Sequence, residues 1–261
     1  MEFYQMTGFM GQPDAVEDED LSTALPPLDK ATLLLDFDGT LVDIAERPEG
    51  ILVSDEVSDI LDRAMNRLNG RVALVSGRSI ETIERFLPTF RGTLIGTHGA
   101  EIRHEGKHEN TIGLDHNTIG LLTRLAEDFA VLRPEFLVEP KPSGVVLHYR
   151  QADHHGALAL RFMESLAMAA DGFRLQPALM AYELKPEGVG KDIALKRLLD
   201  LPMFQGTIPV FAGDDLTDEP ALELVQEMGG TGIKIGQAES VAKARLHDPA
   251  ALLKILDDWL S

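Results

Sequence analysis

Two aspartates, one residue apart, follow an apolar run in the segment ATLLLDFDGTL, residues 31–41. Residues at i and i+2 of an extended chain project to the same side, so Asp36 and Asp38 are expected to face one point. Clustered carboxylates repel one another, and at least one is forced into its neutral form unless a cation lies between them. The spacing therefore predicts a site for a hard cation with oxygen ligands.

Two other polar segments also follow apolar runs. The segment SGR at 76–78 follows RVALV, and the segment GDDLTDE at 213–219 follows TIPVFA. In an open parallel sheet, ligands bind beyond the carboxyl ends of the strands, so these segments and Asp36 are expected to meet at one edge. Lys191 begins the predicted helix KDIALKRLLD, from which its ammonium group can point into the same crevice.

The residue types gathered in this way suit the transfer of a phosphoryl group. The carboxylates of Asp36, Asp38 and Asp214 would repel one another without a cation between them. Mg²⁺ typically has one or two carboxylates and a phosphate oxygen among its ligands. One carboxylate can attack phosphorus to form an aspartyl-phosphate, while a second protonates the leaving alcohol and then activates water. The Ser76 hydroxyl and the Lys191 ammonium group can hold the phosphoryl oxygens and balance their charge.

Most of the chain after residue 31 alternates between short apolar runs and amphipathic helices. One helix is predicted within residues 54–70, with Ser54 as its N-cap and Gly70 at its end. Continuous apolar strands alternating with helices are typical of a parallel sheet that is covered on both faces. The pattern predicts an α/β fold with a Rossmann-like parallel sheet as its core. The apolar runs are TLLLDFD, RVALVSG, TLIGTHG, TIPVFAGDD and GTGIKIG.

The middle of the chain has a different order, in which a helix is followed by two strands, twice over. A helix around 116–131 precedes EFLVEPK and GVVLHYR, and a helix around 154–170 precedes FRLQPALM and AYELKP. Strands that follow each other directly along the chain indicate an antiparallel sheet, separate from the parallel one. This part is predicted to be an α+β cap domain inserted into the core.

These patterns divide the chain into a tail, a core and a cap. The first residues are acidic and end in two prolines, which predicts a disordered tail. The cap is expected to act as a lid with its hinge near Gly113 and near residues 186–188. The predicted ranges are 1–28 for the tail, 29–111 and 185–261 for the core, and 112–184 for the cap.

Composition limits the classes of partner. The chain has 43 Asp and Glu residues against 24 Lys and Arg residues, and a formal net charge of −19, which argues against a nucleic-acid binder. It has no cysteine, no apolar run of the roughly 20 residues that cross a membrane, and no signal-peptide pattern at its start. We expect a cytoplasmic monomer with a small-molecule sugar phosphate as its partner, and neither nucleic acid nor membrane. An anionic ligand would need local cations or a metal to reverse the mean field.

Several segments together resemble a known family. DFDGT, SGR, Lys191 and GDDLTDE look like the motifs of the haloacid dehalogenase superfamily of phosphotransferases. Within it, LIGTHGAEIR, VVLHYR, YELKPEGVGK and GDDLTDE resemble the trehalose-6-phosphate phosphatases, and the resemblance covers roughly residues 31–260. It implies a Mg²⁺-dependent phosphatase of trehalose biosynthesis, which hydrolyses trehalose 6-phosphate to trehalose and phosphate through an aspartyl-phosphate.

The resemblance also implies catalytic roles. Asp36 would be the nucleophile and Asp38 the general acid and base, while Ser76 and Lys191 would bind the phosphoryl group. The chain departs from many members of the family at Asp192, where they have glycine after the lysine. An acidic residue near the start of a helix is favourable, so we expect no loss of activity from this departure.

The metal ligands implied by the resemblance come from the first and last motifs. Mg²⁺ would be bound by Asp36, by the main-chain carbonyl of Asp38 and by Asp214. Asp218 and Asp215 would support them. The three ligands come from the same three residues whose carboxylates are expected to meet, although the ligand from Asp38 would be its main-chain carbonyl.

The cap of the family reads the sugar through polar side chains. Those that match here are Glu139, Lys141, Arg150 and Glu183, and their chemistry suits a polyhydroxylated ligand, because carboxylates accept hydrogen bonds and cationic groups donate them. His98, in GTHGAE, has two interpretations: it contacts the substrate, or it supports residues that do.

Other functions compatible with the same residues remain open. The first is the same reaction on another sugar phosphate, such as sucrose phosphate or mannosylglycerate phosphate. The second is a phosphomutase, although nothing in the sequence marks a means of retaining the phosphoryl group. The third is a non-catalytic sugar-phosphate sensor, which would be expected to lack Asp36 or Asp38, and both are present.

Overall fold

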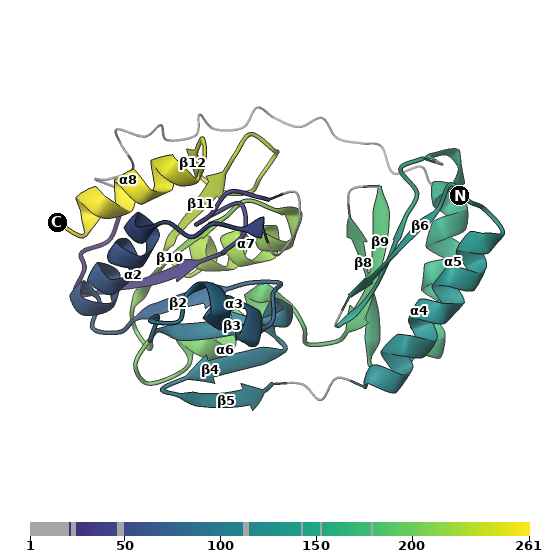
Figure 1. The fold of residues 1–261 in the computed structure, drawn as a ribbon, viewed down its shortest axis with the longest axis horizontal. Coiled ribbons are helices and arrows are strands. Elements are labelled where there is room, and N and C mark those ends of the chain that lie inside the picture. Colours follow the sequence, from purple (N-terminus) through teal and green to yellow (C-terminus); the bar gives the residue numbers. More distant parts are fainter. Residues whose placement is uncertain are drawn as a thin grey trace.

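The computed structural model describes residues 21, 25–45, 50–111, 115–141, 143–151, 153–178 and 180–261. In this part of the chain two separate sheets form, one of eight strands and one of four. Figure 1 shows the larger sheet with its helices on the left and the smaller sheet on the right, with the α4 and α5 helices on the side of it that faces away from the larger sheet.

The larger sheet is mostly parallel, which confirms the predicted α/β fold class. Its strands run in the order β12-β11-β10-β1-β2-β3-β4-β5. The central strands are buried along their whole length, as expected for strands covered on both faces. The bounds are β1 (Ala31–Leu35), β2 (Val72–Val75), β3 (Thr93–Gly96), β4 (Glu101–His104), β5 (Lys107–Asn110), β10 (Ile208–Gly213), β11 (Thr231–Ile235) and β12 (Ala244–Leu246).

The antiparallel hairpin of β4 and β5 at one edge was not expected from the sequence. Its strands are polar, and β5 is exposed along its whole length, so no apolar run marks them. The two residues between the strands, Glu105 and Gly106, both have positive φ (50° and 75°), which is the conformation of a tight type I′ hairpin turn.

Helices cover both faces of the larger sheet. The helices α2 (Asp55–Arg67), α3 (Ile80–Phe86) and α8 (Pro249–Trp259) pack into one apolar core, and α6 (Lys191–Leu199) and α7 (Glu219–Glu227) pack into the other. The Ser54 hydroxyl accepts a hydrogen bond from the amide of Val57 at 3.3 Å, which confirms the predicted N-cap of α2. These cores fix the strands, and therefore the polar residues that follow them.

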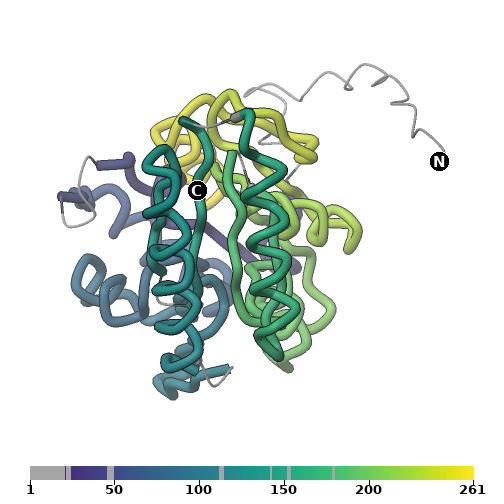
Figure 2. The backbone as a smooth tube through the Cα atoms, turned by 90° about the vertical axis from the view of Figure 1, so that its right-hand side faces the viewer, coloured from purple at the N-terminus to yellow at the C-terminus, as the bar shows by residue number. Residues whose placement is uncertain are grey.

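The smaller sheet is antiparallel, with strand order β6-β7-β9-β8, as the sequence predicts. Figure 2, viewed from that side, shows its two helices lying in front of the sheet. Their apolar faces pack on β7 and β9 and leave the opposite face of the sheet polar. The bounds are β6 (Leu137–Lys141), β7 (Gly144–His148), β8 (Phe173–Ala178), β9 (Ala181–Pro186), α4 (His116–Val131) and α5 (Gly156–Ala169), which follows a short 3₁₀ turn, η3 (Asp153–His155).

Two of the expectations about chain organisation fall largely outside the described residues. Gly113, one expected hinge, lies outside them, and so does most of the 1–28 segment. At the end of that segment, the main-chain oxygen of Pro26 accepts a hydrogen bond from the Trp259 indole at 3.0 Å. The domain boundaries stay predictions. Over the described residues, none of the helices combines the length and the apolar character that crossing a membrane requires.

Candidate active site

The carboxyl ends of three neighbouring strands bring the first polar cluster together. β1 lies between β10 and β2, with Leu35 opposite both Ala212 and Leu74, so the residues that follow these strands emerge side by side. The amide of Asp36 donates to the carbonyl of Ala212 at 3.0 Å, which fixes the main chain at this point. The sheet register therefore places Asp36 at the bottom of a cleft, where its residue is only 4% exposed.

A buried lysine bridges two aspartates in this cleft. The Nζ atom of Lys191 lies 2.6 Å from Oδ1 of Asp36 and 2.6 Å from Oδ1 of Asp218. Burial by itself lowers the pKa of Lys191, but the two carboxylates outweigh it, so the net shift is upward. The lysine is therefore held as a cation at the first turn of α6, directly beside Asp36.

Asp36, Asp214 and Asp218 form a cluster in which one carboxylate oxygen from each residue lies within 4.8 Å of the other two. Burial raises the pKa of Asp36 well above its usual range, and the Lys191 ammonium group offsets this only in part. Burial also raises the pKa of Asp214, and the neighbouring Asp218 carboxylate adds to the shift. Crowded carboxylates of this kind are compatible with a divalent metal, which would favour their ionised forms.

The three carboxylates are not equivalent as ligands. Both oxygens of Asp218 are engaged, one by Lys191 and the other by the amide of Asp215 at 3.0 Å. The Asp36 oxygen that does not contact Lys191 accepts only a long hydrogen bond from the Thr40 hydroxyl, at 3.4 Å. The same hydroxyl lies 3.3 Å from one oxygen of Asp214. Asp36 and Asp214 are therefore the carboxylates most available to a metal.

Gly39 is required where the chain turns past Asp214. Its φ is +77°, and a Cβ atom built on it would lie 2.2 Å from Oδ2 of Asp214. Any other residue would have to displace the carboxylate and adopt a strained backbone. The DFDGT segment thus combines two carboxylates with the only residue type that lets Asp214 approach them.

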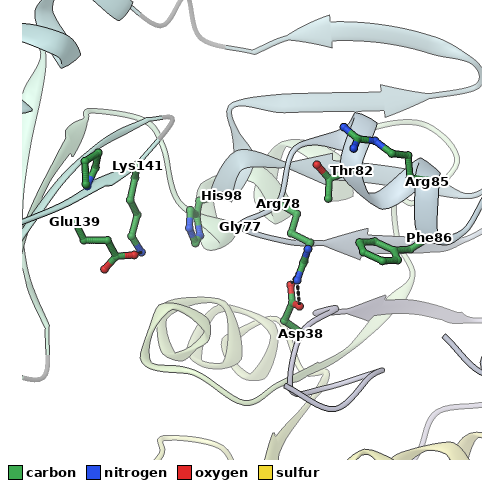
Figure 3. Close-up of a pocket in the computed structure, with 10 residues that line it drawn as sticks. Asp38, Gly77, Arg78, Thr82, Arg85, Phe86, His98, Glu139 and Lys141 are labelled. Atoms are coloured by element: carbon green, nitrogen blue, oxygen red, sulfur yellow. Dashed lines mark hydrogen bonds and ion pairs between the residues drawn. The ribbon is translucent and has the colours of Figure 1, made fainter. Parts of the chain in front are cut away.

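Among the described residues the cluster contains Asp218 and not Asp38. The prediction that the carboxylates of Asp36, Asp38 and Asp214 converge is therefore wrong for Asp38. Its two oxygens are held by the guanidinium of Arg78, with Nε at 2.6 Å and the second nitrogen at 2.8 Å, as the dashed lines in Figure 3 show. The guanidinium in turn lies over the ring of Phe86, 5.3 Å from its centre. Arg78 therefore fixes the orientation of Asp38.

Ser76 lies at the end of β2, fully buried, and its hydroxyl accepts a hydrogen bond from the amide of Arg78 at 3.1 Å. It lines a cavity of about 580 Å³ together with Asp36, Asp38 and Lys191. The four residues to which sequence analysis assigns catalysis therefore share one cavity.

Two residues of the smaller sheet face this region across a larger cavity. Glu139 and Lys141 on β6 line a space of about 840 Å³ whose opposite wall includes Asp38 and Arg78 (Figure 3). Glu139 accepts a hydrogen bond from His148 at 2.9 Å, and its other oxygen lies 3.6 Å from the Lys141 ammonium group.

The other two expected sugar-binding residues lie in different settings. Glu139 is opposite Val146, and Val146 is opposite Glu183, so Glu183 is on the same polar face of the sheet, where it is buried. Arg150 lies in an exposed turn after β7 and does not line the cavities around Asp36 and Glu139. Glu183 therefore shares the polar face of the sheet with Glu139, whereas Arg150 lies in an exposed turn.

Comparisons with known proteins agree with this geometry. Residues 34–250 match the family model described as trehalose-phosphatase. The chain belongs to the trehalose-phosphatase family. A relative, the trehalose-6-phosphate phosphatase of Escherichia coli (strain K12), is 31% identical over 217 residues, which are 83% of this chain and 82% of the relative.

Solved structures with the trehalose-phosphatase fold are also similar. A trehalose-6-phosphate phosphatase related protein has a TM-score of 0.61 at 29% identity, over 87% of this chain and 95% of that structure. The C-terminal domain of the C. albicans trehalose-6-phosphate phosphatase has a TM-score of 0.72 at 21% identity, over 94% of this chain and 97% of that structure, which supports the fold. The family to which sequence analysis assigned the chain is confirmed.

In this trehalose-phosphatase family member, His98 lies where the cavities meet. It is part of the 3₁₀ turn η2 (Thr97–Gly99), in which all three residues have positive φ, and it lines the spaces beside Asp38, Asp36 and Lys185. A Cβ atom on Gly77 would lie 2.6 Å from its ring. Burial, together with the ammonium groups of nearby lysines, lowers the pKa of His98 to about 3, so it is neutral at physiological pH.

Two cationic residues of the site, Arg78 and Lys185, were not predicted from the sequence to be functional. Arg78 was noted only as part of the SGR segment, although its place directly after Ser76 was a usable signal. Lys185 was likewise noted only as part of YELKPEGVGK, because alternation along this segment shows only that it shares a face with Glu183. Its position near Lys191 depends on how the two sheets face each other.

Proposed function

We propose that the chain is a Mg²⁺-dependent phosphatase that hydrolyses trehalose 6-phosphate to trehalose and inorganic phosphate. The observation that carries this is the buried Asp36 carboxylate, held 2.6 Å from Lys191 and clustered with Asp214. The named activity of the E. coli relative supports the substrate.

The proposed reaction has two steps. In the first, an oxygen of Asp36 attacks phosphorus, the bond from phosphorus to the sugar oxygen breaks, and Asp38 gives its proton to that oxygen. In the second, Asp38 takes a proton from water, the water oxygen attacks phosphorus, and the bond to Asp36 breaks. Lys191 and Ser76 hold the phosphoryl oxygens, and Arg78 orients Asp38 while the site is open.

The residues present fit a magnesium ion. The crowded carboxylates of Asp36 and Asp214, both with raised pKa, would hold it with the main-chain carbonyl of Asp38. When bound, the ion neutralises the negative charge of the phosphoryl group and of the carboxylates.

The polar face of the smaller sheet would bind the sugar. A cavity of about 840 Å³ is large enough for a disaccharide, since ligand pockets typically measure roughly 300–1,000 Å³. Glu139, Lys141 and Glu183 would hydrogen-bond its hydroxyl groups as the two sheets close on the substrate. Arg150, which is exposed in the turn after β7, stays a prediction as a sugar-binding residue.

We also propose that the protein acts in the cytoplasm as a monomer, with the sugar phosphate as its partner. The acidic composition, with a net charge of −19 and no cysteine, supports this. Gel filtration with light scattering measures the mass in solution, and a dimer mass would contradict the monomer.

The test is phosphate release from a panel of sugar phosphates, with Mg²⁺ and with EDTA. We expect trehalose 6-phosphate to have the highest kcat/KM, ahead of sucrose phosphate and mannosylglycerate phosphate, and no release in EDTA. Asp36→Asn should be inactive and folded, because an amide cannot attack phosphorus. A different preferred sugar would overturn the substrate. Full activity of Asp36→Asn would overturn the mechanism, and a wild-type protein that binds the sugar phosphate without turnover would be a sensor.

A further inference from the structure

The cations of the larger sheet around Asp36 already have anionic partners. Lys191 is shared between Asp36 and Asp218. Arg78 is paired with Asp38, and the buried Lys234 contacts the carbonyl of Asp214 at 2.5 Å and a carboxylate oxygen of Glu219 at 3.3 Å. These cations are already neutralised by their partners. A dianionic ester that enters this cleft therefore meets a surplus of negative charge.

Lys185 on β9 differs from these cations because it has no anionic group of the described residues in direct contact. Its residue is only 5% exposed, and within the described part of the chain it makes no hydrogen bond and no ion pair. The acidic groups of Glu183 and Asp192 and the cationic groups of Arg174 and Lys141 lie around it. The side chain lines a cavity and contacts none of the described carboxylates directly, so its ammonium group is available to an anionic ligand.

Lys185 lines a cavity of about 340 Å³ beside the cleft. The same cavity is lined by Lys191, His98 and Arg174, so the space connects the lysine of the cleft with the lysine of β9. Arg174 donates one hydrogen bond to the carbonyl of Val189 at 3.0 Å, while its Nε atom is buried without a partner. Two unsatisfied cationic donors thus lie in one cavity that reaches Lys191.

We propose that Lys185 binds the phosphoryl group of the substrate, and the phosphate product, from the side of the smaller sheet. The proposal rests on the function proposed above and adds to it a cation outside the larger sheet. An anion in this position would satisfy the Lys185 ammonium group and lie beside Lys191. The smaller sheet would then bind the phosphoryl group as well as the sugar.

Charge favours an anion over a sugar hydroxyl as the partner of Lys185. Burial lowers the pKa of Lys185, and the nearby Arg174 and Lys141 add to this, while Glu183 and Asp192 oppose it. A bound dianion stabilises the ammonium form, whereas a neutral hydroxyl does so only weakly. Glu139 and Lys141, farther along the same face, remain for the sugar.

Calorimetric titration of inorganic phosphate into the full chain with Mg²⁺ tests this directly. In Lys185→Met the phosphate Kd should rise at least about tenfold, because a charge-assisted hydrogen bond is lost. Lys185→Arg should retain most of the affinity, since it keeps the charge. Lys196→Met, which removes an exposed lysine from the last turn of α6, should not change it. An unchanged Kd in Lys185→Met would overturn the proposal.

Kinetics separates phosphate binding from sugar binding. Lys185→Met should raise KM for trehalose 6-phosphate and for p-nitrophenyl phosphate by similar factors, because both carry the phosphoryl group. A loss confined to trehalose 6-phosphate would make Lys185 a sugar ligand and overturn the proposal. The phosphate titration does not depend on turnover, so it decides the role of Lys185 even if trehalose 6-phosphate is not the substrate. Thermal melting checks that the variants are folded.

Discussion

At the scale of single residues, the site depends on close contacts that only one residue type permits. Gly39 lies against the Asp214 carboxylate with positive φ, and Gly77 lies against the ring of His98. The side chains to which we assign the chemistry are also held by direct contacts, Asp38 by the guanidinium of Arg78 and Asp36 by Lys191. Small errors in these positions are expected to cost activity before they cost stability.

Gly39→Ala tests this point against a matched control. Both Gly39 and Gly106 have positive φ, but a Cβ atom on Gly106 meets nothing within 4 Å. Each substitution should cost roughly 1–2 kcal/mol of backbone strain. Only Gly39→Ala displaces Asp214, so we expect a loss of about a hundredfold in kcat for it and full activity for Gly106→Ala. Phosphate release and urea unfolding measure the two effects, and equal activities would contradict the role of Gly39.

His98 gives a prediction about pH. Its pKa is about 3 in the folded protein and close to 6.5 in an unfolded chain. Between these values the unfolded state binds a proton that the native state does not, so the free energy of unfolding falls as the pH is lowered. This penalty is absent near pH 7.5 and grows below about pH 6.5.

His98→Asn should remove that dependence, because asparagine does not titrate and tolerates positive φ. From about pH 7.5 to pH 5, the variant should lose about 1–2 kcal/mol less stability than the wild-type protein. Urea unfolding at both pH values measures the difference. Parallel pH profiles for the two proteins would show that His98 takes up its proton in the native state as well.

At the scale of elements, the site is divided between two sheets. The carboxyl ends of β1, β2 and β10 supply residues to which we assign phosphoryl transfer, and β6 and β9 supply a polar face opposite them. The helices of the smaller sheet pack only on its other face, which leaves this polar face open to the cavity. The reaction and the choice of sugar are therefore expected to be separable by mutation.

Lys141→Ala should show this separation. Lys141 lines the larger cavity from β6, far from the carboxylate cluster in the chain. We expect kcat/KM for trehalose 6-phosphate to fall by about tenfold or more, as for a lost hydrogen bond to a charged group, and kcat/KM for p-nitrophenyl phosphate to change little. Lys107→Ala, on the exposed β5, is the control. Equal losses on both substrates would remove β6 from sugar recognition.

At the scale of the whole molecule, a strongly acidic chain has to admit an acidic ligand. The net charge is −19, and the cleft holds a cluster of three carboxylates, of Asp36, Asp214 and Asp218. A bound divalent metal, together with the cations on the polar face of the smaller sheet, would offset this field locally. Stability and activity are therefore expected to depend on the same ion.

Magnesium should raise the melting temperature as well as support turnover. An ion that binds only the native state stabilises it by about 2.7 kcal/mol when its concentration is a hundred times Kd. Thermal melting with increasing Mg²⁺ should show this rise, and EDTA should abolish phosphate release. In Asp214→Asn the rise should be much smaller. A melting temperature that does not respond to Mg²⁺ would argue against the proposed metal site.

The amino-acid sequence alone determined most of the strands and helices and the types of polar residue that follow the strands. The apolar runs before Asp36, Ser76 and Asp214 indicate buried parallel strands, because such runs are stable only when both faces are covered. The spacing of apolar residues and the cap at Ser54 likewise predict α2. The polar β4–β5 hairpin carries no such signal.

Only the tertiary structure decided which side chains meet. It pairs Asp38 with Arg78 and joins Asp218 to Lys191, and it brings Lys185 to the cavity while leaving Arg150 in an exposed turn. Local periodicity tells which face of a strand a residue occupies. What that face meets depends on how the two sheets pack, and their packing is set by contacts between residues far apart in the chain.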